Sequence, residues 1–316
     1  MFNGKKDAGG SRIRDLLKEL RSLALQNPSD PHLRSHLSRG LFSALTYVTE
    51  SGDTSERDRI VQELRDLAAE HPEDDVVRGN LARALFNALN FAHADRNAEA
   101  RERALQELRT LSAEHPGDET VREHVSKALF NALNYAKEEG DLPRRDSLLD
   151  ALRDVYEQGG AEESTRLRLA KGLFNVLSHA VEEEDSRKAQ SLLAELRELG
   201  ARHPEDAEIR ARVAKGLATV LHQTCKGQDA SAATQLLDEL REIAGAHPDQ
   251  LVLRESLAIG LSDALQVMGE GGDPGRRADL LEELRTLASN HPDAETIQAR
   301  LASGIVSELS LARHES

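Results

Sequence analysis

The sequence contains one cysteine, no tryptophan, and only six phenylalanines and three tyrosines among 316 residues. A single cysteine cannot form an internal disulfide or a cysteine-based zinc site, so Cys225 is expected to be a small, partly buried side chain. The scarcity of aromatic residues predicts a core built from Leu, Ala and Val.

Long apolar runs are also missing. No window approaches the roughly 18 apolar residues that a membrane helix needs, and the opening MFNGKKDAGGSRIR lacks the apolar run of a secretory signal. We therefore expect a cytoplasmic protein.

Several classes of chemistry find no support in the sequence. It has no P-loop, Gly-rich dinucleotide fingerprint, His-Glu-x-x-His motif or paired acid–base site, so neither an enzyme nor a cofactor or metal site is predicted. The net charge of −15 argues against non-specific nucleic-acid binding by the whole surface.

What the sequence does contain is a repeat of 44 residues. Its clearest mark is a column of prolines, with Gly160 in the remaining position: Pro28, Pro72, Pro116, Pro204, Pro248 and Pro292. A Leu-Arg pair, such as Leu64–Arg65, recurs with the same period. The sequence thus predicts a disordered stretch over residues 1–10 and a single helical-repeat domain of seven units over residues 11–316.

Each unit carries two patterns with helical spacing. Val77, Leu81 and Leu85 mark the first, here called the A helix, which follows a His-Pro pair. The second, the B helix, follows an expected Asp or Asn N-cap. These caps are Asp53, Asn97, Asp141, Asp185, Asp229 and Asp273.

The chain is expected to begin with a B helix over residues 12–26 and to end with an A helix over residues 295–313, giving about fourteen helices. One helix pair cannot bury both of its apolar faces, so neighbouring units must stack. The predicted fold is all-α, a right-handed α–α superhelix, or solenoid, of stacked antiparallel helix pairs.

These residues resemble a known family. Leu81-Ala82 followed by Leu85, with a proline closing the second helix in EHPGD, is similar to the Leu-Gly…Tyr…Pro skeleton of tetratricopeptide repeats in all seven units. The family's repeats usually have 34 residues, and Arg78 stands where an aromatic residue is expected. By period alone, HEAT or armadillo arrays of about 40–47 residues fit better, although no third helix for armadillo is found.

The two alternatives differ in the helix that lines the concave face. The tetratricopeptide resemblance implies A helices there, whereas a HEAT-like array would place B helices there. Both remain open at this point.

Four columns of the A helix are predicted to face solvent. On a helical wheel, Asn80, Arg83, Asn87 and Asn90 lie opposite the apolar face. Across the seven units these columns hold eight Arg or Lys residues and one acid, Asp263, in a chain with 56 acidic and 41 basic residues. The predicted ligand-binding residues are Arg39, Arg83, Asn87, Asn90, Lys127, Asn131, Asn134, Arg168, Lys171, Asn175, Arg212 and Lys215.

Within these columns a cation and an amide lie four residues apart, as in Lys127 and Asn131, and successive A helices repeat the pair. A cation with an oriented amide donor suits a carboxylate. The arrangement resembles the carboxylate clamp of chaperone-binding tetratricopeptide domains, although those clamps place the lysine one helical turn earlier. The alternative is that these residues have internal acidic partners on neighbouring units.

The sequence therefore predicts a scaffold for protein–protein interaction, which binds an acidic peptide segment or a C-terminal carboxylate in a basic, Asn-rich groove of A helices. Single-stranded RNA binding by the helical repeat is the alternative. Self-association through the end helices, near Ile13 and Ile305, is a further option. Arg78 and Arg65, with their copies, are expected to have structural partners of the Glu63 type.

Overall fold

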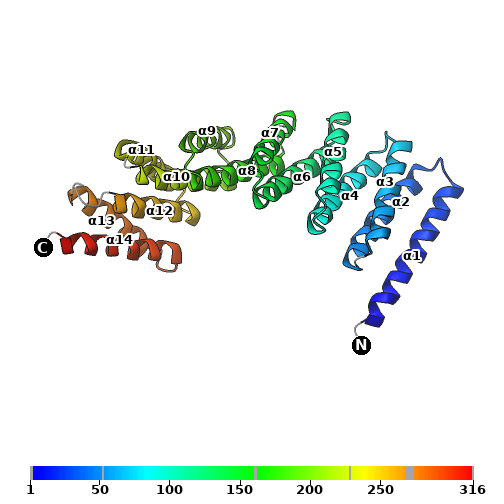
Figure 1. Ribbon diagram of the computed structural model, residues 1–316, viewed down its shortest axis with the longest axis horizontal. Helices are drawn as coiled ribbons and strands as arrows, with labels where there is room; N and C mark the ends of the chain where they lie inside the picture. Colours follow the sequence, from blue (N-terminus) through cyan, green and yellow to red (C-terminus); the bar gives the residue numbers. More distant parts are fainter. Residues whose placement is uncertain (1–2, 52, 160–161, 228, 268–273, 315–316) are drawn as a thin grey trace. The chain divides into compact units, whose positions relative to one another are not determined.

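The computed structural model describes residues 3–51, 53–159, 162–227, 229–267 and 274–314. These residues form fourteen α-helices and no strand (Figure 1). The helices are α1 (Asn3–Gln26), α2 (Pro31–Ser51), α3 (Thr54–Glu70), α4 (Asp75–Ala94), α5 (Ala98–Glu114), α6 (Glu119–Glu138), α7 (Leu142–Gly159), α8 (Glu163–Glu182), α9 (Ser186–Arg202), α10 (Ala207–Lys226), α11 (Ala230–Ala246), α12 (Leu251–Val267), α13 (Pro274–Asn290) and α14 (Glu295–His314). Odd-numbered helices are B helices and even-numbered helices are A helices.

Two compact units make up the chain, residues 1–169 and residues 170–316. In the first unit, α4 packs against α3 and α5 and also against the A helices α2 and α6. In the second unit, α12 packs in the same way against α11, α13, α10 and α14. This confirms the all-α solenoid of stacked helix pairs. The handedness, the helix that lines the concave face, and the single continuous domain stay predictions.

The predicted helix ends are confirmed where the structure describes them. Asp53, Asn97, Asp185 and Asp229 are N-caps whose side chains accept a hydrogen bond from the backbone N–H three residues later. The histidines of the His-Pro pairs form the C-caps of the same helices. The last A helix begins at Glu295, as expected. The predicted cap Asp273 and the turn residue Gly160 lie outside the described residues.

The first helix is longer than predicted. It begins at Asn3 instead of residue 12, so residues 3–10, expected to be disordered, are helical. Gly10 is buried, and a Cβ atom added there would lie 2.9 Å from Tyr47 Oη of α2. The first helix therefore continues across a surface that α2 supplies, which the local sequence does not reveal.

Consecutive B helices are joined by ion pairs of the predicted kind. Arg21 Nη2 lies 2.6 Å from Glu63 Oε2, and Arg65 Nε lies 2.7 Å from Glu107 Oε2. In the second unit the same pairing joins Arg197 to Glu239 and Arg241 to Glu283. Each pair spans one unit, but all are partly exposed, so each contributes only about 0.2–1 kcal/mol.

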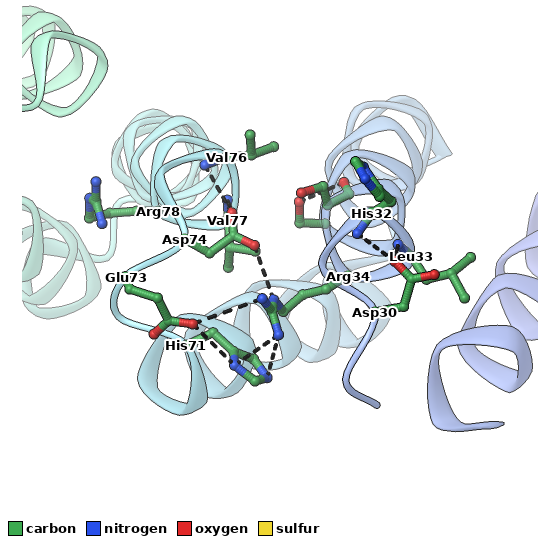
Figure 2. A network of polar contacts seen from close by, with 12 residues as sticks. Asp30, His32, Leu33, Arg34, His71, Glu73, Asp74, Val76, Val77 and Arg78 are labelled. Atoms are coloured by element: carbon green, nitrogen blue, oxygen red, sulfur yellow. Dashed lines mark hydrogen bonds and ion pairs between the residues drawn. The ribbon is translucent and has the colours of Figure 1, made fainter. Parts of the chain in front are cut away.

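Consecutive A helices are joined by a second series of ion pairs, whose partners differ from the prediction. Arg34 Nε donates to Asp74 Oδ2 at 3.0 Å, and Arg78 Nε donates to Asp118 Oδ2 at 2.7 Å. Asp74 is the N-cap of α4 and also accepts hydrogen bonds from the N–H groups of Val76 and Val77 (Figure 2). The acid is thus the cap of the next A helix, not a residue of the Glu63 type, because the arginine points along the stack.

The single cysteine is buried in α10, which confirms its expected packing role. Burial raises the pKa of the Cys225 thiol to about 11, so the nucleophilic thiolate is scarce at neutral pH. We expect a maleimide to label the folded protein at least about 100-fold more slowly than the chain unfolded in guanidinium, because a pKa difference of two units changes the thiolate fraction by that factor. Equal labelling rates would contradict this.

Candidate functional site

Two of the predicted ligand-binding residues line one cavity in the first unit. This cavity, of about 620 Å³, runs along α4 from Arg83 to Asp75, with Arg39 of α2 on one side and Glu119 and Thr120 of α6 on the other. Its volume lies in the range of sites that take up small ligands or side chains.

Two of the cations in this cavity are available to a ligand. Arg39 and Arg83 are exposed, and neither forms an ion pair with any residue that the structure describes. Arg78 also lines the cavity, but its charge is matched by Asp118. The cavity therefore offers two free guanidinium groups from consecutive A helices.

The other end of the cavity is acidic. Asp75 and Glu119 occupy equivalent positions in the first turns of α4 and α6, and both are exposed. They lie eight residues before the corresponding basic positions in their helices, which is about 12 Å along an α-helix. This cavity is thus basic at one end and acidic at the other, whereas the sequence predicted a basic, Asn-rich groove.

The next cation along the predicted row is already matched by an internal acid. Lys127 Nζ lies 2.6 Å from Glu123 Oε1, one helical turn earlier in α6. The hydrogen bond from Lys127 holds the pKa of the Glu123 carboxyl below its ordinary value, despite partial burial. Lys127 is therefore less available to a ligand than Arg39 or Arg83.

The predicted amide row forms a network within the protein. Asn131 Nδ2 and Tyr135 Oη both donate to Asn90 Oδ1, each at 2.9 Å. Asn134 is half-buried and has an interaction partner of its own. Asn87 is half-buried and lies one turn after Arg83, which leaves it as the amide best placed beside the free arginines.

The remaining predicted residue of the first unit, Arg168, is structural. It donates hydrogen bonds to Ser126 Oγ at 2.9 Å and to Ser164 Oγ at 3.0 Å, and burial lowers the pKa of its guanidinium. Its charge is directed into the protein.

Four predicted residues belong to the second unit: Lys171, Asn175, Arg212 and Lys215. Lys171 and Lys215 are half-buried and form no ion pair with a described residue. The Arg212 guanidinium lies over the Phe174 ring, 5.8 Å from its centroid, and Asn175 has an interaction partner. The cavity beside Cys225 in this unit, of about 220 Å³, is lined by other residues.

The prediction that all four A-helix columns face solvent is wrong for the first of them. Asn80 is only 3% exposed and donates a hydrogen bond to Ser38 Oγ of α2 at 2.9 Å; His124 and Ser256 are also buried. Asp263, in another of these columns, is buried beside His222. An A helix contacts two B helices and adjacent A helices, so its buried arc is wider than one apolar stripe.

Sequence reasoning missed the acidic end of the cavity and the A-helix ion pairs. Both could have been found, because Asp30, Asp74, Asp118 and Asp206 share the 44-residue period, as do Asp75 and Glu119. An acid repeated at the start of most A helices is a recognisable cap signal.

No described helix combines the length and apolar character that crossing a membrane requires. The described residues also contain no group of three or more His, Cys, Asp or Glu side chains arranged to hold a metal ion. Compared with models of protein families and with curated proteins, the chain finds no match.

Proposed function

We propose that this protein is a non-enzymatic scaffold whose first unit, residues 1–169, binds an acidic peptide segment or the C-terminal carboxylate of another protein at Arg39 and Arg83. A tetratricopeptide-like use of the A helices as the binding wall is part of this proposal, as is a cytoplasmic location.

The observation that carries the proposal is the pair of free arginines in one cavity. Several arginines of the first unit pair with nearby acids, as Arg57 does with Asp95 at 3.1 Å. Arg39 and Arg83 have no such partner among the described residues. A guanidinium group binds a carboxylate with two parallel hydrogen bonds, so two of them on consecutive helices suit an acidic side chain or a chain terminus.

The acidic end of the cavity supports a spacing of charges in the bound segment. Asp75 and Glu119 repel a second acidic group and favour a cation or an N–H donor about 12 Å from the arginines. A segment with a lysine or arginine three or four extended residues from its acidic group matches both ends, because an extended chain spans about 3.3 Å per residue.

The test is a binding titration with fluorescent peptides that carry the basic and acidic groups at this spacing, with either a free or an amidated C-terminus. Replacing both arginines (Arg39→Glu with Arg83→Glu) is expected to weaken binding by at least about 100-fold, since each charge-assisted contact contributes about 1.5–3 kcal/mol. Binding should also weaken with added salt.

The matched control carries the same change of charge elsewhere in the first unit, as Arg96→Glu with Arg109→Glu. Both arginines are exposed, lie outside the cavity and have no side-chain partner among the described residues. The control should bind as the unmodified protein does. Equal loss in both double variants, or tight binding of single-stranded RNA with no binding of the peptides, would refute the proposal.

A further inference from the structure

The outer face of α14 is apolar and exposed at positions that are buried in every earlier A helix. Ile305 is 37% exposed and Leu309 is 61% exposed. The leucines equivalent to Ile305, none more than 1% exposed, are Leu41, Leu85, Leu129, Leu173, Leu217 and Leu261. Those equivalent to Leu309, all fully buried, are Leu45, Leu89, Leu133, Leu177, Leu221 and Leu265. In a solenoid, the stacking of a neighbouring unit covers such a face.

The first helix has the corresponding feature on its own free side. Leu16 is 55% exposed. The residues equivalent to it, all buried, are Ile60, Ala104, Leu148, Leu192, Leu236 and Leu280. Thus α1 presents an apolar side chain at a position that is buried in the other six B helices.

The packing around the repeated glycines shows which surfaces match. A Cβ atom added at Gly260 would meet Leu221 of the preceding A helix and Leu237 and Leu240 of the preceding B helix. Gly304 has the equivalent three neighbours.

At Gly40 of α2, by contrast, the described residues that such an atom would meet are Leu17 and Leu20 of α1. The leucine from a preceding A helix has no counterpart among them. In the 44-residue register, the position that should supply it is that of Leu309.

Charges on the two surfaces are complementary in the same register. The B-helix ion pairs join an arginine to a glutamate 42 residues later, as in Arg241 and Glu283. Arg285 is the next arginine of this column, and its partner among the described residues is Glu282 within its own helix. Glu19 is the equivalent of Glu283 on α1, and it is exposed. A contact that continues the repeat places Arg285 beside Glu19.

We propose that copies of this chain associate head to tail, with α13 and α14 of one copy packed against α1 and α2 of the next. Leu309 then packs on Gly40, Leu17 and Leu20 of the second copy, and Arg285 pairs with its Glu19. The interface repeats the contact between neighbouring units, and it is heterologous, because its two sides are different surfaces.

The test uses two single variants of the full chain, each of which disables one side. Leu309→Glu disables the α14 side and Leu16→Glu disables the α1 side. Because burial of an unpaired carboxylate is unfavourable, each is expected to lower the association constant at least about tenfold in sedimentation velocity. Mixing the two variants should restore a 1:1 complex that does not grow further, since one intact copy of each surface remains.

Leu25→Glu is the matched control. Leu25 of α1 is 81% exposed, and the equivalent Ala69 and Ala113 are exposed as well, so this variant should associate as the unmodified chain does. Circular dichroism checks that all three variants stay folded. A chain that remains monomeric at high micromolar concentration overturns the proposal. So does a mixture that stays monomeric, or a single variant that associates undiminished through a symmetric contact.

A second experiment tests the register of the two surfaces by exchanging the charges of Arg285 and Glu19. Arg285→Glu and Glu19→Arg should each weaken association about threefold through repulsion between like charges. Combining both changes in one chain should restore it. A combined variant weaker than either single one would overturn the proposed pairing.

Discussion

Replacing Asp74 with alanine is expected to lower the free energy of unfolding by about 2.5–4 kcal/mol. The N-cap contributes about 1 kcal/mol, and loss of the hydrogen-bonded ion pair with the largely buried Arg34 adds about 1.5–3 kcal/mol. The Asp74 side chain is only 8% exposed, so solvent screens this pair weakly. Because Asp74 begins the helix that carries Arg83, the same change should weaken peptide binding. Urea unfolding followed by circular dichroism measures the first effect.

Two further variants separate the cap from the ion pair. Asp74→Asn keeps a good capping residue and removes the charge. It should therefore lose only the contribution of the ion pair to the free energy of unfolding. Asp53→Ala removes an N-cap that is exposed and has no ion pair among the described residues, so it should cost about 1 kcal/mol. If Asp74→Ala and Asp53→Ala prove equally destabilising, the A-helix ion pairs contribute nothing measurable.

The ion pair also predicts a dependence on pH. Burial alone raises the pKa of the Asp74 carboxyl, but hydrogen bonds from Arg34 and from the N–H groups of Val77 and Val76 leave it below its ordinary value. A lowered pKa in the folded state stabilises the protein above the unfolded pKa of about 3.9, and the contribution is lost as the pH falls through the folded value. The difference in stability between the native chain and Asp74→Asn should therefore be full at pH 7 and shrink below about pH 4. A constant difference would contradict it.

The repeat made most of the fold predictable from sequence. The caps at Asp53 and Asn97 and the pairing of Arg65 with a Glu63-type residue follow from local rules applied with the 44-residue period. The burial of Asn80 does not follow from these local rules. A helical wheel assigns each residue one angle, whereas the burial of Asn80 depends on Ser38 of the neighbouring A helix, to which it donates a hydrogen bond.

In the candidate site, the sequence itself distinguishes Lys127 from Arg39 and Arg83. Lys127 has Glu123 one helical turn earlier, while the residues at this position before Arg39 and Arg83 are Ser35 and Gly79. An acid four residues before a cation favours an ion pair within the helix. This spacing alone separates the matched Lys127 from the free arginines. The cavity between α4 and α6 needed the structure, because it depends on how the two helix starts are placed.

Replacing Gly260 with leucine is expected to destabilise the second unit by about 2–3 kcal/mol, because the core there has no room for a side chain. A Cβ atom would lie 2.7 Å from Leu221 Cδ2 and 3.0 Å from Leu240 Cδ1, and a leucine adds three more carbon atoms. Thermal unfolding and urea unfolding both measure the loss.

The same substitution at Gly245 is the matched control. This glycine lies near the end of α11, is exposed, and would have nothing within 4 Å of a Cβ atom. Because leucine favours a helix more than glycine does, Gly245→Leu should raise stability by about 0.5 kcal/mol. Opposite signs at the two sites would show that a small residue is required where consecutive A helices meet, since Ala84 and Ala128 hold the equivalent positions in two other units. Equal effects would mean that the leucines around Gly260 move aside, and close packing would not explain why Gly40, Gly216, Gly260 and Gly304 recur with the repeat.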